Sequence, residues 1–254
     1  MIPAWLSLLD AIVALVLLAV GILGPHFNLV LPMAGFSMFL LSFLVALLAL
    51  LIGLVGLWRT AAPERRAGRP RAVAGIVLGL LVAVPVGLVM WHWMSMPYPL
   101  INDITTDYDN PPEFVQPPGM SPALMKYNRA KFQPVQSKDY PALEPLKLDG
   151  SPDDAFNKVT SAAKGRPEWI IIIADPKTHT IEGVEVSHLF HFIDDFVIQV
   201  RPGPDPNTSL VEMRSRSRDG TGDFGMNYNR IRGFFAELKQ GGAEAPHAQP
   251  ASAS

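Results

Sequence analysis

The sequence predicts a membrane anchor of three helices followed by an α+β domain outside the cytoplasm. Residues 1–96 are almost all hydrophobic, whereas residues 97–254 hold most of the Pro, Asp, Lys and Arg. The formal net charge is only -2, so no overall positive field favours a nucleic-acid partner. The chain contains no cysteine, which excludes disulfides, thiolate metal sites and cysteine nucleophiles.

The membrane anchor is predicted from three apolar segments. A helix needs about 20 apolar residues to cross a bilayer, and the segments that meet this length are about 4–23, 33–58 and 72–93. No basic residue precedes the first segment and Gly24-Pro25 leads into another one, so a cleaved signal peptide is disfavoured. Amphipathic rings that suit the membrane interface stand at the segment ends, at Trp5, Trp58, Trp91 and Trp93.

The loop between the second and third spans sets the expected orientation. It carries five arginines, namely Arg59, Arg65, Arg66, Arg69 and Arg71. The loop between the first two spans has no Lys or Arg. The positive-inside rule therefore predicts that residues 59–71 and the N-terminus lie in the cytoplasm. In a bacterium the anchor would lie in the inner membrane as a multi-pass protein, with the C-terminal domain in the periplasm. Asp10, inside the first span, is expected to reach water at the cytoplasmic interface.

The second half of the chain divides by composition. Residues 97–145 are rich in proline and predict an extended segment with one short helix around residues 121–132. Regular patterns begin near residue 146 and predict an α+β domain over 146–240. Residues 241–254 are small and polar, which predicts a disordered tail.

The order of elements in 146–240 predicts an antiparallel sheet with two covering helices. A strand around "LEPLKLDG" precedes a helix over residues 151–166, with Ser151 or Asp153 as N-cap. The apolar run "EWIIIIAD" predicts a central strand, and alternating patterns predict strands over 179–192, 194–202 and 208–218. A last helix over 224–240 buries Ile231, Phe234, Phe235 and Leu238. The arrangement is similar to a reduced helix-grip fold, an analogy at the level of fold only.

A row of arginines is the most distinctive polar pattern. Arg214, Arg216 and Arg218 share one face of the predicted last strand because strand side chains alternate. Neighbouring guanidinium groups repel, so the row needs anions. One alternative is an anionic ligand such as a phosphate, a carboxylate or a lipid headgroup. The other is an internal network with Asp223, Glu212 or the acids of "NDITTD".

Metal and catalytic sites are not predicted. His188 and His191 would face opposite sides of a strand, and the stretch "TDYDNPP" fails an EF-hand register because the fifth position from Asp107 is Pro111. No ordered Ser-His-Asp set or paired-carboxylate cleft follows from spacing. We therefore expect no metal, no cofactor and no catalytic residue.

Two long motifs resemble a known family. "NDITTDYDNPPEF" and "RSRSRDGTGDFGMNYNRI" are similar to the two signatures of the domain-of-unknown-function family numbered 1499, over about residues 98–240. The family's usual pattern matches the candidate site residues named at the end of this paragraph, and it also matches Pro111, Pro112, Ser215, Ser217 and Gly225. It departs at Tyr108-Asp109-Asn110. The family has no agreed biochemical role, so the resemblance implies no activity. The candidate site residues, either ligand-binding or a structural polar network, are Asn102, Asp103, Thr105, Thr106, Asp107, Arg214, Arg216, Arg218, Asp223, Asn227 and Arg230.

The leading hypothesis is a membrane-anchored extracytoplasmic binding module, without catalysis, for an anionic or lipid-like ligand. Its expected partners are the membrane, a lipid or an anionic small molecule, and not nucleic acid. One alternative is a scaffold or assembly partner of a membrane protein complex. Another is an uncharacterised enzyme.

Overall fold

The chain forms two compact units. The computed structural model describes residues 2–61, 63–115 and 121–240. One unit comprises Met1–Pro97 with Ser187–Phe192, and the other comprises Tyr98–Val186 with Ile193–Ser254. The tail 241–254, expected to be disordered, lies outside the described residues.

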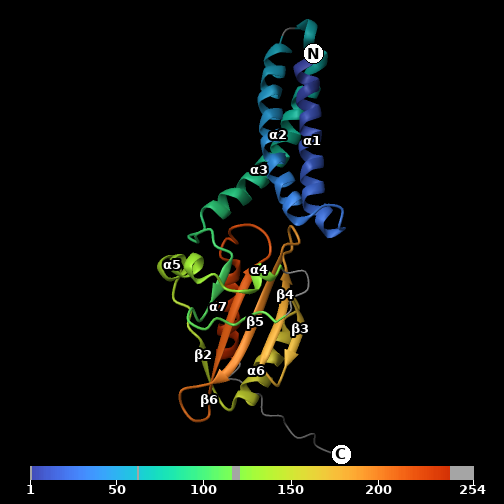
Figure 1. Cartoon of the computed structure of the whole chain (residues 1–254). Coiled ribbons are helices and arrows are strands. Elements are labelled where there is room, and N and C mark those ends of the chain that lie inside the picture. The colour runs from blue at the N-terminus through green and yellow to red at the C-terminus, as the bar shows by residue number, and fades with distance from the viewer. Residues whose placement is uncertain (1, 62, 116–120, 241–254) are drawn as a thin grey trace, which may run out of the picture. The chain divides into compact units, whose positions relative to one another are not determined.

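The first unit consists mainly of three long helices (Figure 1). They are α1 (Ile2–His26), α2 (Pro32–Arg59) and α3 (Arg69–Met94), and a 3-10 turn, η1 (Pro63–Gly68), precedes α3. All three are long and apolar enough to cross a membrane. The three predicted helices are therefore confirmed, and their insertion in a membrane follows from length and composition.

Small residues bring these helices into close contact. A Cβ atom added to Gly75 of α3 would lie 2.2 Å from Oγ of Ser7 in α1, and one added to Gly79 would lie 3.0 Å from the Leu50 side chain of α2. The Ser7 hydroxyl donates a hydrogen bond of 2.8 Å to the carbonyl of Ala49. The glycine face of α3 thus packs inside this chain, as small residues do between membrane helices.

The second unit contains a six-stranded antiparallel sheet. The strand order is β1-β6-β5-β4-β3, and β2 also pairs with β6. The strand bounds are β1 (Asp103–Thr105), β2 (Leu146–Asp149), β3 (Trp169–Asp175), β4 (Thr180–Val186), β5 (Ile193–Pro202) and β6 (Thr208–Ser217). The predicted α+β class with an antiparallel sheet is confirmed.

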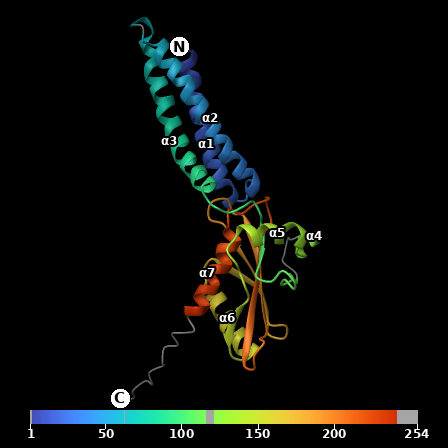
Figure 2. The ribbon, with the colours of Figure 1, turned by 90° about the vertical axis from the view of Figure 1, so that its left-hand side faces the viewer.

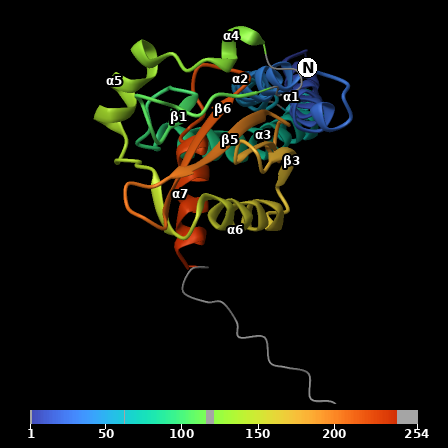
Figure 3. The same ribbon diagram turned by 60° about the horizontal axis from the view of Figure 1, so that its bottom comes forward.

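Two helices cover one face of the sheet, as Figures 2 and 3 show. These are α6 (Pro152–Gly165), whose first turn is capped by the Ser151 side chain, and α7 (Met226–Gln240). We call this the inner face of the sheet. The opposite, outer face lies toward α4 (Pro122–Met125) and α5 (Arg129–Asp139). Residues 97–145, for which an extended segment is expected, contain β1, α4 and α5.

The main core lies between the inner face and the two helices. The predicted apolar face of the last helix is confirmed, because Ile231, Phe234, Phe235 and Leu238 are all buried. They belong to one cluster with residues of the sheet and of α6, including Phe196, Ile198, Met213, Phe156 and Val159.

Two strand predictions are wrong. The apolar strand β3 lies at an edge of the sheet, with Ile170 57% and Ile172 37% exposed. β3, β4, β5 and β6 are neighbours in the sheet in that order, and β1 and β2 both pair with β6 at the other side. Among the described residues, β3 therefore pairs with β4 alone. The strand expected over 179–192 ends at Val186, because Ser187 and Phe192 close a turn by backbone and side-chain hydrogen bonds. His188 and His191 therefore lie in this turn and not on a strand.

Gly225 offers a test of how the start of the second unit is held. Its φ is +79°, and an added Cβ would lie 2.2 Å from the ring of Tyr98. We expect Gly225→Ala to lower the free energy of unfolding by about 1–3 kcal/mol, since both the backbone conformation and the ring contact become strained. Urea unfolding of the purified chain measures this change.

The matched control is Gly165→Ala. Gly165 ends α6, and an added Cβ would meet no atom within 4 Å. Alanine favours a helix more than glycine does, so stability should be unchanged or slightly higher. Equal destabilisation by the two substitutions would contradict the structural account of Gly225.

Candidate functional site

The arginine row lies on the outer face of the sheet, as the alternation predicts. In the register of β1, β6 and β5, Asp103 and Asp195 stand on either side of Arg216. Thr105 stands beside Arg214 in the same way. The outer-face side chains of three strands therefore meet in one polar cluster.

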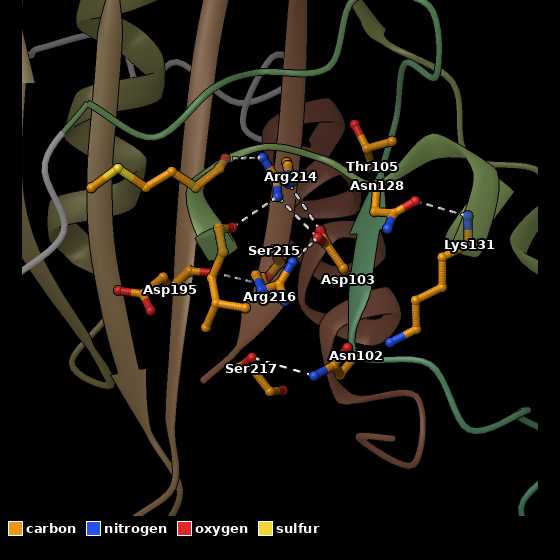
Figure 4. Close-up of polar contacts among 12 residues, drawn as sticks. Asn102, Asp103, Thr105, Asn128, Lys131, Asp195, Arg214, Ser215, Arg216 and Ser217 are labelled. Carbon is orange, nitrogen blue, oxygen red and sulfur yellow. Dashed lines mark hydrogen bonds and ion pairs between the residues drawn. The ribbon is translucent and has the colours of Figure 1, made fainter. Parts of the chain in front are cut away.

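Arg214 is completely enclosed. Its Nε and Nη2 donate to the two carboxylate oxygens of Asp103, at 2.9 Å each, and both side chains are 0% exposed. Its Nη1 donates to the carbonyl of Met125 at 2.7 Å (Figure 4). The guanidinium also lies 4.9 Å from the ring centre of Phe114 and 5.4 Å from that of Tyr127. Every part of this cation is matched by a carboxylate, a carbonyl or an aromatic ring.

Arg216 and Arg218 are held differently. Arg216 donates only from Nη1, to Asp103 at 2.6 Å, and its buried Nε has no acceptor among the described residues. Arg218 holds Asp195 with both Nε and Nη2, at 2.7 Å each, and this bonding raises the pKa of Arg218. Three guanidinium groups on the outer face thus share two carboxylates.

On the inner face, by contrast, the carboxylates outnumber the arginine that they bind. Arg230 of α7 pairs with Asp194 at 2.7 Å and with Glu185 at 2.8 Å. It also donates to Asn227 and to the Ser215 hydroxyl. Burial alone would lower the pKa of Arg230, but the two carboxylates outweigh it and raise the pKa. Arg230 and Asn227 therefore anchor α7 to the sheet.

The first motif is held to the last strand by further hydrogen bonds. The backbone of Thr105 pairs with the Gln136 side chain, which accepts from its N–H and donates to its carbonyl. The Thr106 hydroxyl accepts from the N–H of Met213 at 2.9 Å. Asn102 donates to the loop after β6 through its side-chain amide. These three residues fasten β1 to β6 and α5.

Two predicted site acids do not join the arginines. Asp107 accepts from the N–H groups of the two residues that follow Tyr108, and so closes a turn. Asp223 accepts from the N–H groups of Gly225 and Asn227, at 2.9 and 2.8 Å, at the start of α7. Burial raises the pKa of Asp223. Both acids satisfy backbone amides.

Two acids of β5 belong to the polar contacts although the sequence does not predict them as site residues. Asp194 and Asp195 follow each other, so one faces Arg230 on the inner side and the other faces Arg218 on the outer side. The signal was the pair of acids that opens the otherwise apolar strand "DDFVIQV". Consecutive strand residues point to opposite faces, so each face receives one carboxylate.

Two surface grooves lie away from this cluster. The larger, of about 680 Å³, lies between residues 142–147 and the α7 side chains of Arg232, Phe235, Ala236 and Lys239. The smaller is lined by residues of α6 and α7. Neither contains a residue of the predicted site. In the part of the chain that the structure describes, no group of three or more His, Asp or Glu side chains could hold a metal ion.

A comparison with family models supports the resemblance of the two motifs. The model described as "Protein of unknown function (DUF1499)" matches residues 103–238. This range runs from β1 into α7, and it includes every predicted site residue except Asn102. No curated protein matches the chain.

Asp103→Asn tests how much the ion pairs of Asp103 with Arg214 and Arg216 contribute to the free energy of unfolding. The substitution leaves Arg214 buried without a carboxylate and removes the partner of Arg216. Breaking a buried ion pair from one side costs about 3–5 kcal/mol, so we expect a loss of stability of this size in urea unfolding.

The control for this change is Asp109→Asn. Asp109 pairs with Arg129 at the surface, with side chains 82% and 51% exposed. Water screens such a pair, so stability should change little. A small effect of Asp103→Asn, similar to that of the control, would mean that the buried cluster does not stabilise the domain.

Proposed function

The chain belongs to the DUF1499 family of proteins of unknown function, and we propose that it is a membrane-anchored binding module for an anionic or lipid-like ligand. The module would act outside the cytoplasm and without catalysis. Its ligand would be bound on the outer face of the sheet, where the residues of the two motifs meet.

One observation carries this proposal. Arg214, Arg216 and Arg218 share the two carboxylates of Asp103 and Asp195, so this group of side chains has one more positive than negative charge. The other acids of the outer face are engaged elsewhere, because Glu212 pairs with Arg201 and Glu182 accepts from the N–H of Val115. Burying a charge without a partner is costly. The surplus carboxylate beside Arg230 lies on the inner face and accepts no hydrogen bond from the outer arginines. An anion on the outer face would correct the imbalance locally.

The proposed orientation has support within the membrane unit. The guanidinium of Arg71, at the end of the arginine-rich loop, lies 4.3 Å from the ring centre of Trp5 near the N-terminus. The N-terminus and this loop would therefore lie on the same, cytoplasmic side. After a third span, the residues beyond α3 would lie on the opposite side, in the periplasm of a bacterial cell.

A scaffold role is the second candidate. It is favoured by the exposed Ile170 and Ile172 on the edge strand β3, since apolar edge strands invite pairing with another chain. It gains no support from the glycines of α3, which pack against this chain's own helices. An enzyme is the third candidate. His179 pairs with Asp153 at 2.6 Å, but neither residue lines a groove named above.

Native mass spectrometry of the detergent-solubilised chain tests the binding function. We expect a fraction of the protein to retain an anionic adduct, such as a phospholipid, because its contact is charge-assisted and partly buried. Arg129→Gln, which changes an exposed surface arginine, should leave the adduct in place. A bare monomer under all conditions that preserve folding would overturn the proposal.

Cysteine labelling tests the orientation, because the chain has no cysteine of its own. Single variants would carry a cysteine at exposed positions, Lys177→Cys in the second unit and Ala67→Cys in the arginine-rich loop. In intact spheroplasts an impermeant maleimide should label the first variant and not the second. Permeabilised cells should show labelling of both. The reverse pattern in intact cells would contradict the proposed orientation.

A further inference from the structure

The three arginines of the outer face differ in which edge of the guanidinium they use. Arg214 and Arg218 each hold a carboxylate with Nε and Nη2, the pair of donors that forms the fork on one edge. Arg216 donates to Asp103 from Nη1 alone. Its Nε/Nη2 edge makes no hydrogen bond to any described residue. The edge that its two neighbours use to hold carboxylates is therefore unpaired in Arg216.

This unpaired edge is largely shielded from water. The side chain of Arg216 is only 8% exposed, and its Nε is buried without an acceptor. A buried donor without a partner costs about 1–3 kcal/mol, so an acceptor at this position would stabilise the fold. The ring of Phe132, itself buried, has its centre 5.8 Å from the Arg216 guanidinium and helps to exclude water.

The nearby acids cannot fill this position as they are arranged. Asp103 gives one oxygen to Arg214 alone and shares the other between Arg214 and Arg216. Asp195 stands beside Arg216 in the strand register but gives both oxygens to Arg218. The missing acceptor is thus one that the described residues do not provide.

We propose that the Nε/Nη2 edge of Arg216 binds an oxyanion that presents two adjacent oxygens, as a phosphate or a carboxylate does. This inference rests on the proposed function and assigns its ligand contact to one edge of one residue. Arg214 and Arg218 take no direct part, because their forks are occupied. The oxyanion is either a free anion or the headgroup of a lipid, and the two sources share the same chemistry at the contact.

The test uses the full-length chain in neutral detergent. Sodium phosphate is titrated against sodium chloride at equal ionic strength, and the melting temperature is followed. We expect phosphate, and not chloride, to raise the melting temperature and to shift the Nε–H resonance of Arg216 in NMR spectra. A second arm uses nanodiscs of phosphatidylcholine with and without phosphatidylglycerol. Stabilisation only by phosphatidylglycerol would identify a lipid headgroup as the source.

Two conservative variants locate the contact. Arg216→Lys keeps a positive charge but loses the fork, so the apparent affinity for phosphate or phosphatidylglycerol should fall by about tenfold or more. The matched control is Arg129→Lys, which makes the same change in an exposed arginine that pairs with Asp109 outside the outer-face arginine row. Its response to the anion should match that of the wild-type chain.

The outcomes separate this inference from the proposed function. Anion binding that is unchanged in Arg216→Lys would refute the assigned contact and leave the binding function standing. No stabilisation of the wild-type chain in either arm would overturn both. If Arg216→Lys fails to fold, the wild-type Nε–H resonance decides the matter. An Arg216 resonance that does not move while phosphate binds would refute the assignment.

Discussion

The buried ion pair between Arg214 and Asp103 is the contact on which the second unit depends. Both side chains are fully enclosed, and they join positions 111 residues apart in the sequence. β1 is only three residues long, so its backbone hydrogen bonds alone are too few to hold the segment before α4 against the sheet. The ion pair supplies this attachment, and Gln136 supplies a second one from α5. The segment after β1 can then cover the outer face, where Phe114 packs on Val197.

Strand register explains why three arginines with identical spacing have three different environments. In the register of β1 with β6, Thr105 lies opposite Arg214 and Asp103 lies opposite Arg216. The Asp103 carboxylate can therefore bind both arginines. Arg218 lies beyond the end of β6 and turns to β5, where Asp195 is available. In the motif "RSRSR", the guanidinium of Arg214 is therefore enclosed, that of Arg216 is partly paired, and that of Arg218 lies at the periphery. Only the middle one keeps an unused pair of donors.

The sequence predicts features that depend on local periodicity. The membrane helices, the burial of Ile231 and Phe234, and the common face of the arginine row all follow from spacing. Features that depend on which strands pair are not predicted. The exposure of Ile170 follows from the sheet order, because an apolar run looks the same at an edge and in the centre. β1 escapes prediction because it is too short to alternate, and the roles of Asp194 and Asp195 require the β5–β6 register.

A count of charges alone would miss the proposed site. If Arg230 and its two acids are counted together with Arg214, Arg216 and Arg218, four guanidinium groups meet four carboxylates, those of Asp103, Asp194, Asp195 and Glu185. The cluster is neutral as a whole, but the sheet divides it, and a carboxylate on the inner face cannot accept a hydrogen bond from the outer one. Arg216 therefore lacks, above all, a hydrogen-bond acceptor of suitable geometry, and the negative charge of that acceptor is less important. A site of this kind distinguishes ligands by the arrangement of their oxygens, because any anion could neutralise the charge but only a two-oxygen acceptor fits the fork.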